Sequence, residues 1–149
     1  MCEVDGSNIT QFTDPKESCR SPRLHPITNE VYYLSNRVGG PHNSTSEIKK
    51  YDFETKITVT LIGIPSNVQG PTQFPGLYVD QLPVNCFTER GDLVFSSIWR
   101  CQKRALVLRF GRVESLSRMD DMSSYNVLFV RGGYALVTQG TPTYPSRLV

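Results

Sequence analysis

Few side chains in this sequence are placed to carry out acyl-transfer chemistry. Serine hydrolases place a nucleophilic serine on a sharp strand-to-helix turn, written G-x-S-x-G, and an acid and a histidine complete the catalytic triad. No such pentapeptide occurs, and the two histidines, His25 and His42, have no serine on an elbow of this kind before them. The sequence therefore predicts no catalytic residue and no triad within this chain.

One glycine-rich segment is similar to an oxyanion-hole loop. Gly39-Gly40-Pro41-His42 follows a predicted strand and offers backbone N–H groups that such a loop would direct at a developing negative charge. Val38 stands where the loop type has a histidine, and Gly and Pro also build ordinary tight turns. Donors without a nucleophile cannot complete acyl transfer, so we predict a simple turn between strands.

The four cysteines indicate neither a metal site nor a cofactor. Cys2, Cys19, Cys86 and Cys101 are widely spaced and form no C-x-x-C pair, which argues against zinc. Cys86 stands in an apolar stretch and is predicted to be a buried thiol, and neither Cys86 nor Cys101 has a histidine nearby in sequence for a cysteine peptidase. The first ten residues lack the apolar run of a secretory signal, so we predict reduced thiols and a cytoplasmic location.

Aromatic and basic side chains admit a binding interpretation and a simpler one. Tyr32, Tyr33, Phe95 and Trp99 could line a ligand groove, but at strand spacing such residues are more often core. The basic residues Arg100, Lys103 and Arg104 crowd one hairpin turn. Because glycine-rich backbone donors are missing there, we interpret them as a solvated loop and not as a phosphate site.

The overall charge excludes some partners. Sixteen Lys and Arg residues against fourteen Asp and Glu residues give a net charge of +2, without a run of basic residues. A nucleic-acid partner is therefore not predicted. No apolar stretch approaches the roughly 18 residues that a membrane-spanning helix requires, so no membrane partner is predicted either.

Short β-branched and aromatic runs, separated by Pro, Gly, Asn and Asp, predict an all-β fold. Helical spacing of apolar residues is not sustained anywhere. The expected strands are 30–35, 47–52, 57–62, 77–87, 92–99, 104–110, 113–117, 125–130 and 134–139.

Similar strands recur along the chain. Val31-Tyr32-Tyr33-Leu34 matches Leu93-Val94-Phe95-Ser96 and then Tyr134-Ala135-Leu136-Val137. Repeats of roughly 40–50 residues are typical of four-stranded propeller blades, although a β-sandwich with a similar number of strands remains an alternative. We predict a poorly defined N-terminal segment at 1–20 and blades spanning 21–149, at about 21–64, 76–118 and a truncated 125–149. Two to three such antiparallel blades cannot close a ring and would leave an apolar sheet face bare at each end.

The order of several short segments is similar to the propeller of acylaminoacyl peptidases, also called acylamino-acid-releasing enzymes, of the prolyl oligopeptidase clan. The resemblance covers roughly residues 21 to 149. The segments that carry it are Ser21-Pro22-Arg23-Leu24, Val31-Tyr32-Tyr33-Leu34, Lys50-Tyr51-Asp52, Gly76-Leu77-Tyr78, Leu82-Pro83, Cys86-Phe87, Leu93-Val94-Phe95-Ser96-Ser97, Leu136-Val137 and Thr141-Pro142.

This resemblance implies the non-catalytic cap of a cytosolic serine peptidase that removes N-acylated amino acids from blocked peptides. The implied partners are a C-terminal α/β-hydrolase domain of the parent chain, short N-acylated peptides and further copies of the parent in a homo-oligomer. Without the serine elbow, the chain alone is predicted to be inactive. A stand-alone propeller module that binds another protein is the alternative function.

Overall fold

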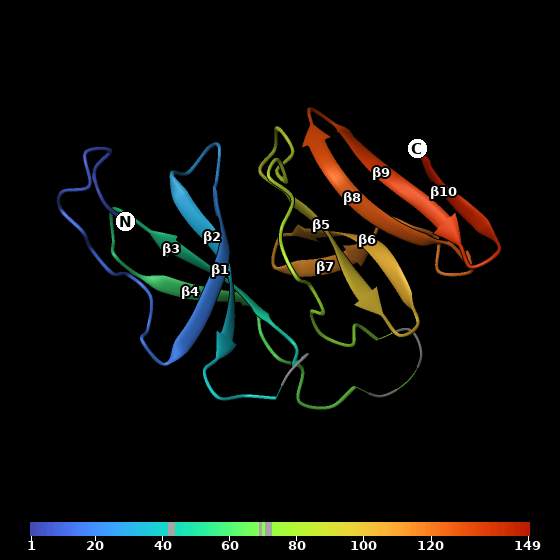
Figure 1. Cartoon of the computed structure of the whole chain (residues 1–149), viewed down its shortest axis with the longest axis horizontal. Coiled ribbons are helices and arrows are strands. Elements are labelled where there is room, and N and C mark those ends of the chain that lie inside the picture. The colour runs from blue at the N-terminus through green and yellow to red at the C-terminus, as the bar shows by residue number, and fades with distance from the viewer. Residues whose placement is uncertain (42–43, 69, 71–72) are drawn as a thin grey trace.

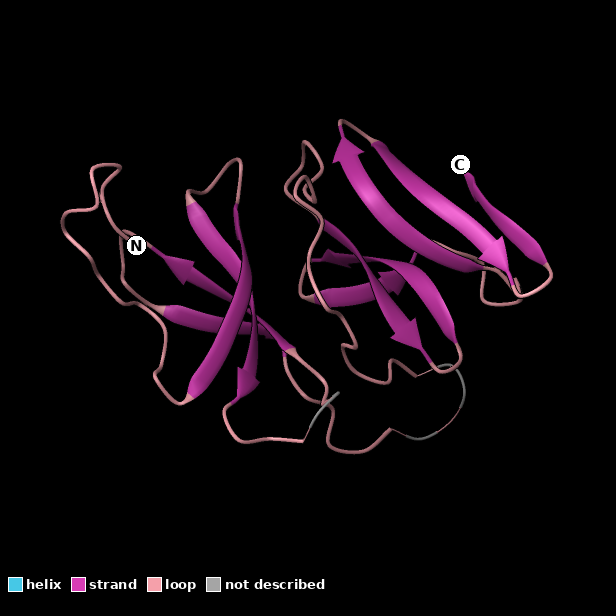
Figure 2. Cartoon of the chain, viewed as in Figure 1, coloured by secondary structure: helices cyan, strands magenta, loops and turns pink. Residues whose placement is uncertain are grey.

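The computed structural model describes residues 1–41, 44–68, 70 and 73–149, and its regular elements within those ranges are all β-strands (Figure 2). They form three antiparallel sheets, which do not close into a ring (Figure 1). The first sheet holds β1 (Glu17–Leu24), β2 (Glu30–Arg37), β3 (Glu47–Asp52) and β4 (Thr58–Ile62). The second holds β5 (Leu93–Trp99), β6 (Gln102–Arg109) and β7 (Arg112–Ser115), and the third holds β8 (Ser124–Arg131), β9 (Tyr134–Thr141) and β10 (Tyr144–Leu148).

The all-β prediction is confirmed. Within the described ranges no helix has the length and apolarity needed to span a membrane. Most predicted strands agree with observed ones to within a few residues, and 47–52 coincides with β3. The first sheet has four strands and the other two have three each, so the number of propeller blades stays a prediction.

The predicted strand at 77–87 is wrong. This segment makes only single bridges, from Leu77 to Ser46 and from Phe87 to Leu93, and contains no strand. Its apolar residues are nevertheless buried, because Leu77, Leu82 and Cys86 are at most 1% exposed. The alternation in the sequence therefore reflects burial of this segment and not pairing with a neighbouring strand.

The second sheet is packed on both faces because alternate side chains of β5 point in opposite directions. Leu93 and Phe95 join the core between the first and second sheets, whereas Val94 joins the core between the second and third. The next two residues of β5, Ser96 and Ser97, also point to opposite faces of the sheet. The Oγ of Ser96 accepts the backbone N–H of Val127 in β8 at 2.6 Å, and the Oγ of Ser97 accepts that of Tyr78 at 2.9 Å.

The outer face of the first sheet is covered by the N-terminal segment. The ring of Phe12 stacks on Tyr51 with ring centroids 4.7 Å apart and meets Tyr33 edge-on. The expectation of a bare face here is therefore wrong. The first strand, β1, also begins at Glu17, inside the segment predicted to be poorly defined.

The outer face of the third sheet is bare, as predicted. Register pairs Phe129 with Leu136 on the face opposite to the buried Val127 and the partly buried Val137, and the side chains of Phe129 and Leu136 are about two-fifths exposed. Leu148, on β10, is more exposed still. An apolar patch on a sheet face marks a surface that packs against another element.

Candidate functional site

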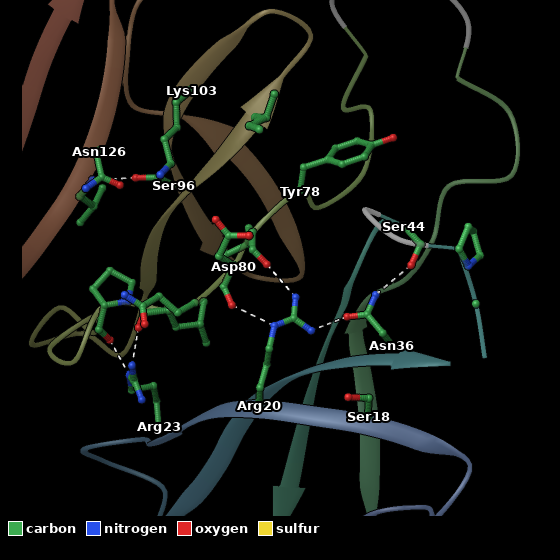
Figure 3. Close-up of a pocket in the computed structure, with 18 of the residues that line it drawn as sticks. Ser18, Arg20, Arg23, Asn36, Ser44, Tyr78, Asp80, Ser96, Lys103 and Asn126 are labelled. Carbon is green, nitrogen blue, oxygen red and sulfur yellow. Dashed lines mark hydrogen bonds between the residues drawn. The ribbon is translucent and has the colours of Figure 1, made fainter. Parts of the chain in front are cut away.

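A cavity of about 1420 Å³ lies beside β1, β5 and β8, which are the first strands of the three sheets (Figure 3). Its walls come from β1, from residues 78–84 that precede β5, and from residues 126–128 of β8. The end of β2 with the turn after it, and parts of β5 and β6 with the turn between them, complete the lining. Segments from all three sheets therefore contribute to one concave surface.

A bulge in β1 places two arginines on the cavity side. Residues two apart in a strand share a face, so Arg20 and Arg23, three apart, would normally point in opposite directions. The register shifts between them, so that Arg20 pairs with Leu34 and Arg23 with Tyr32. Ser21, within the bulge, has a φ of 53°. The extra residue brings both guanidinium groups to the same face of the sheet.

The two arginines fasten the segment that lacks strand structure. Arg20 donates through Nε to the carbonyl of Asp80 at 2.9 Å and through Nη2 to that of Val79 at 2.8 Å. Arg23 donates through Nε to the carbonyl of Pro83 at 2.6 Å and through Nη2 to that of Leu82. The carbonyl groups of these four residues, which a sheet would satisfy with a neighbouring strand, are satisfied here by side chains. These bonds hold residues 79–83 in place without a strand.

The cavity is strongly basic. Five cationic residues line it, against one carboxylate, Asp80. Arg20 and Arg23 are bound by carbonyls and form no ion pair with any described residue. The remaining three cations are Arg37, Arg100 and Lys103.

The glycine-rich segment forms the turn that the sequence predicts. Gly39 has a φ of 76°, and the N–H of Gly40 bonds to the carbonyl of Arg37 at 3.3 Å. Gly39, Gly40 and Pro41 line the rim of the cavity, whereas His42 lies outside the described residues. One of the two N–H groups of an oxyanion-type loop is therefore committed to closing the turn.

His25 is buried and has a structural role. Its Nδ1 accepts the backbone N–H of Thr28 at 3.1 Å, so the proton is assigned to Nε2, which donates to the carbonyl of Gly91 at 3.1 Å. The ring also stacks on Tyr32 and meets Phe87 edge-on. These contacts join the turn after β1 to the turn before β5, away from the cavity lining. Both ring nitrogens are occupied, which leaves none to act as a base.

Burial makes two of the four cysteines poor nucleophiles. Burial raises the pKa of the Cys86 thiol to about 12, which confirms the predicted buried thiol. The pKa of Cys19 is also raised, chiefly by burial. Cys101 is exposed at the turn after β5 and lines the cavity. In the described part of the chain, no three His, Cys, Asp or Glu residues are grouped as they would be around a metal ion.

The predicted core aromatics are mostly core. Tyr33, Phe95 and Trp99 are at most 7% exposed, and burial raises the pKa of the partly buried Tyr32 to about 12. The expectation of a solvated basic loop is wrong for Arg104, which is 4% exposed. Its guanidinium donates to the carbonyls at residues 118 and 119 and thereby holds the turn before β8.

Sequence reasoning missed the cavity as a whole. Its most informative signal was a serine and a proline between two arginines at 20–23, because Pro lacks an N–H and favours a bulge or an edge strand. Residues 78–84 carry no pattern that distinguishes a cavity wall from a strand.

Comparison with known proteins places this all-β arrangement in a family. The family model described as "Acylamino-acid-releasing enzyme, N-terminal domain" matches residues 2–148. The chain belongs to this family. The acylamino-acid-releasing enzyme of Mus musculus is 28% identical over 149 residues, and that of Homo sapiens is 27% identical. Each match covers 98% of this chain but 20% of the relative, so the chain spans about a fifth of the length of these enzymes.

Proposed function

We propose that this chain is the substrate-gating β-propeller part of an acylamino-acid-releasing enzyme, with its three sheets acting as blades. In this proposal a C-terminal α/β-hydrolase domain supplies the catalytic residues, and short N-acylated peptides are the substrates. The observation that carries it is the match of residues 2–148 to the N-terminal domain of that enzyme. The contribution of the chain is then to limit which peptides reach the catalytic domain, through the shape and charge of its concave edge.

The bare face of the third sheet supports this proposal. Phe129, Leu136 and Leu148 leave apolar surface uncovered, and sheets of a propeller bury such surface against the next sheet. The first sheet already has a cover, so the third sheet is where a further blade of the same polypeptide would pack.

A chimera tests the gating function directly. The matched segment of the Mus musculus enzyme is replaced by this chain, and hydrolysis of acetyl-alanine p-nitroanilide is compared with that of a long acetylated polypeptide. We expect the chimera to cleave the short substrate and to reject the long one, while the 149-residue chain alone shows no turnover. Turnover by the chain alone, or equal cleavage of short and long substrates by the chimera, would contradict the proposal.

Mutation of the bare face gives a second test. Leu136→Lys should lower the thermal stability of the chimera, because it places a charge in the expected interface, and should reduce self-association of the isolated chain in size-exclusion chromatography. Phe110→Lys is the matched control, because Phe110 is 96% exposed at the turn between β6 and β7. A chain that is monomeric before mutation and unchanged by Leu136→Lys would favour the stand-alone interaction module.

A further inference from the structure

The net positive charge of this chain is located at the cavity. The whole chain has sixteen basic and fourteen acidic residues. Five of the basic residues and one of the acidic residues line the cavity, so eleven basic and thirteen acidic residues lie elsewhere. The cavity thus has an excess of four positive charges, and the rest of the chain has an excess of two negative charges. A concave surface with charges of one sign concentrates ligands of the opposite sign.

Two of the cavity cations have no described partner. The side chains of Arg37, at the end of β2, and Lys103, on β6, form no hydrogen bond or ion pair with any described residue. Arg37 belongs to the first sheet and Lys103 to the second, so the two cations approach the cavity from different sheets. Figure 3 shows Lys103 on the side of the cavity away from Arg20 and Arg23.

The other cavity cations are fixed in place. Arg20 and Arg23 are held by backbone carbonyls, and Arg100 donates to the carbonyl of Gly70 at 2.8 Å. Carbonyl partners keep the positive charge in position without neutralising it, whereas a carboxylate partner would cancel it. The cavity therefore combines three fixed cations with two that are free to contact a ligand.

We propose that this cavity binds peptides through their carboxylate groups. The inference rests on the proposed function and names the peptides that the gate favours: acylated peptides with acidic side chains or a free carboxyl terminus near the bound end. The cavity volume of about 1420 Å³ exceeds the roughly 300–1,000 Å³ of typical small-molecule sites, so a segment of several residues fits. Arg37 and Lys103 are the contact residues, and Arg20 and Arg23 supply the fixed field.

Fluorescence anisotropy of labelled peptides with the 149-residue chain tests this inference. The probes are acetylated pentapeptides with two internal glutamates, two glutamines or two lysines, each with an amidated terminus, and the glutamine peptide with a free terminus. We expect the glutamate peptide to bind roughly three- to tenfold more tightly than the amidated glutamine peptide, and the lysine peptide to bind most weakly. The free-terminus peptide separates terminal from side-chain recognition. Because exposed charges are screened over about 8 Å at physiological ionic strength, this preference should shrink as salt is added.

Charge-matched variants locate the site. Arg37→Gln with Lys103→Gln should abolish the preference for glutamate, and neither change removes a side-chain hydrogen bond to a described residue. Arg112→Gln with Arg131→Gln removes the same net charge outside the cavity lining and should leave the preference intact. The inference would be overturned if glutamate and glutamine peptides bound equally, or if both double variants lost the preference for glutamate to the same extent.

The chimera separates this inference from the proposed function. An active chimera that still rejects long substrates but cleaves acetylated glutamate and glutamine peptides with the same kcat/KM would overturn the carboxylate preference alone. A higher kcat/KM for the glutamate peptide, lost with Arg37→Gln and Lys103→Gln, would support it.

Discussion

Replacing Gly91 with alanine should separate the first two sheets where His25 joins them. Gly91 has a φ of 85°, and a Cβ at this position would lie 2.6 Å from Nε2 of His25. The imidazole cannot withdraw freely, because its Nδ1 accepts the N–H of Thr28 and its ring is packed between Tyr32 and Phe87. The substitution therefore adds a steric cost to the backbone cost.

The magnitude follows from two contributions. A left-handed backbone costs a residue with a Cβ about 1–2 kcal/mol. Overpacking of a filled site adds about 1–3 kcal/mol, so Gly91→Ala should lower the free energy of unfolding by about 2–5 kcal/mol in total. Gly111→Ala is the matched control, because its φ is 72° and a Cβ there meets nothing within 4 Å. It should cost only the backbone contribution of about 1–2 kcal/mol.

Urea denaturation at low protein concentration measures the free energy of unfolding of both variants. Their melting temperatures should differ by about 2–4 °C for each kcal/mol of difference in that free energy. In a His25→Ala background the extra cost of Gly91→Ala should disappear, since the atom that it meets is gone. Equal destabilisation by Gly91→Ala and Gly111→Ala, or the same difference between them without His25, would refute the steric contact.

Two further measurements test local chemistry. The hydroxyl of Tyr125 and the N–H of Ser123 donate to Asp121 and lower its pKa to about 2. The ionised carboxylate therefore stabilises the fold above about pH 4, and this contribution is lost as the pH falls through 2. Tyr125→Phe removes one donor and should raise the pKa of Asp121 toward its ordinary value in an NMR titration. The exposed thiols of Cys2 and Cys101 should react with a thiol reagent at pH 8 far faster than Cys86, which should react only on unfolding; rapid labelling of Cys86 in the folded chain would contradict its burial.

The sequence predicts elements well where burial and strand pairing coincide. In β3 and β5 most apolar residues are buried and the backbone is also paired, so clusters of apolar residues locate these strands. Residues 77–87 also bury apolar side chains, but the carbonyls of residues 79, 80, 82 and 83 bond to Arg20 and Arg23, which lie about 60 positions earlier in the chain. Hydrophobic pattern reports which side chains are buried and says nothing about which group satisfies the backbone.

The cavity was beyond sequence reasoning for a related reason. One extra residue in β1 decides that Arg20 and Arg23 share a face, and Pro22 favours a bulge or an edge strand without fixing the register that decides between them. The basic character of the cavity was equally hidden, because the chain as a whole is nearly neutral. Arg37 and Lys103 belong to different sheets, and no spacing in the chain relates them.

The arginines of β1 combine two roles that constrain each other. Their hydrogen bonds hold residues 79–83 against the first sheet, and their uncompensated charges make the cavity basic. Replacement of either arginine removes charge-assisted bonds of about 1.5–3 kcal/mol each and leaves carbonyls without these partners, so we expect a loss of stability that obscures the effect of charge. The side chains of Arg37 and Lys103 make no such bonds within the part of the chain that the structure describes. The charge of the cavity can therefore be altered at those two positions without loss of the fold, and it is there that changes in peptide preference between relatives are expected to arise.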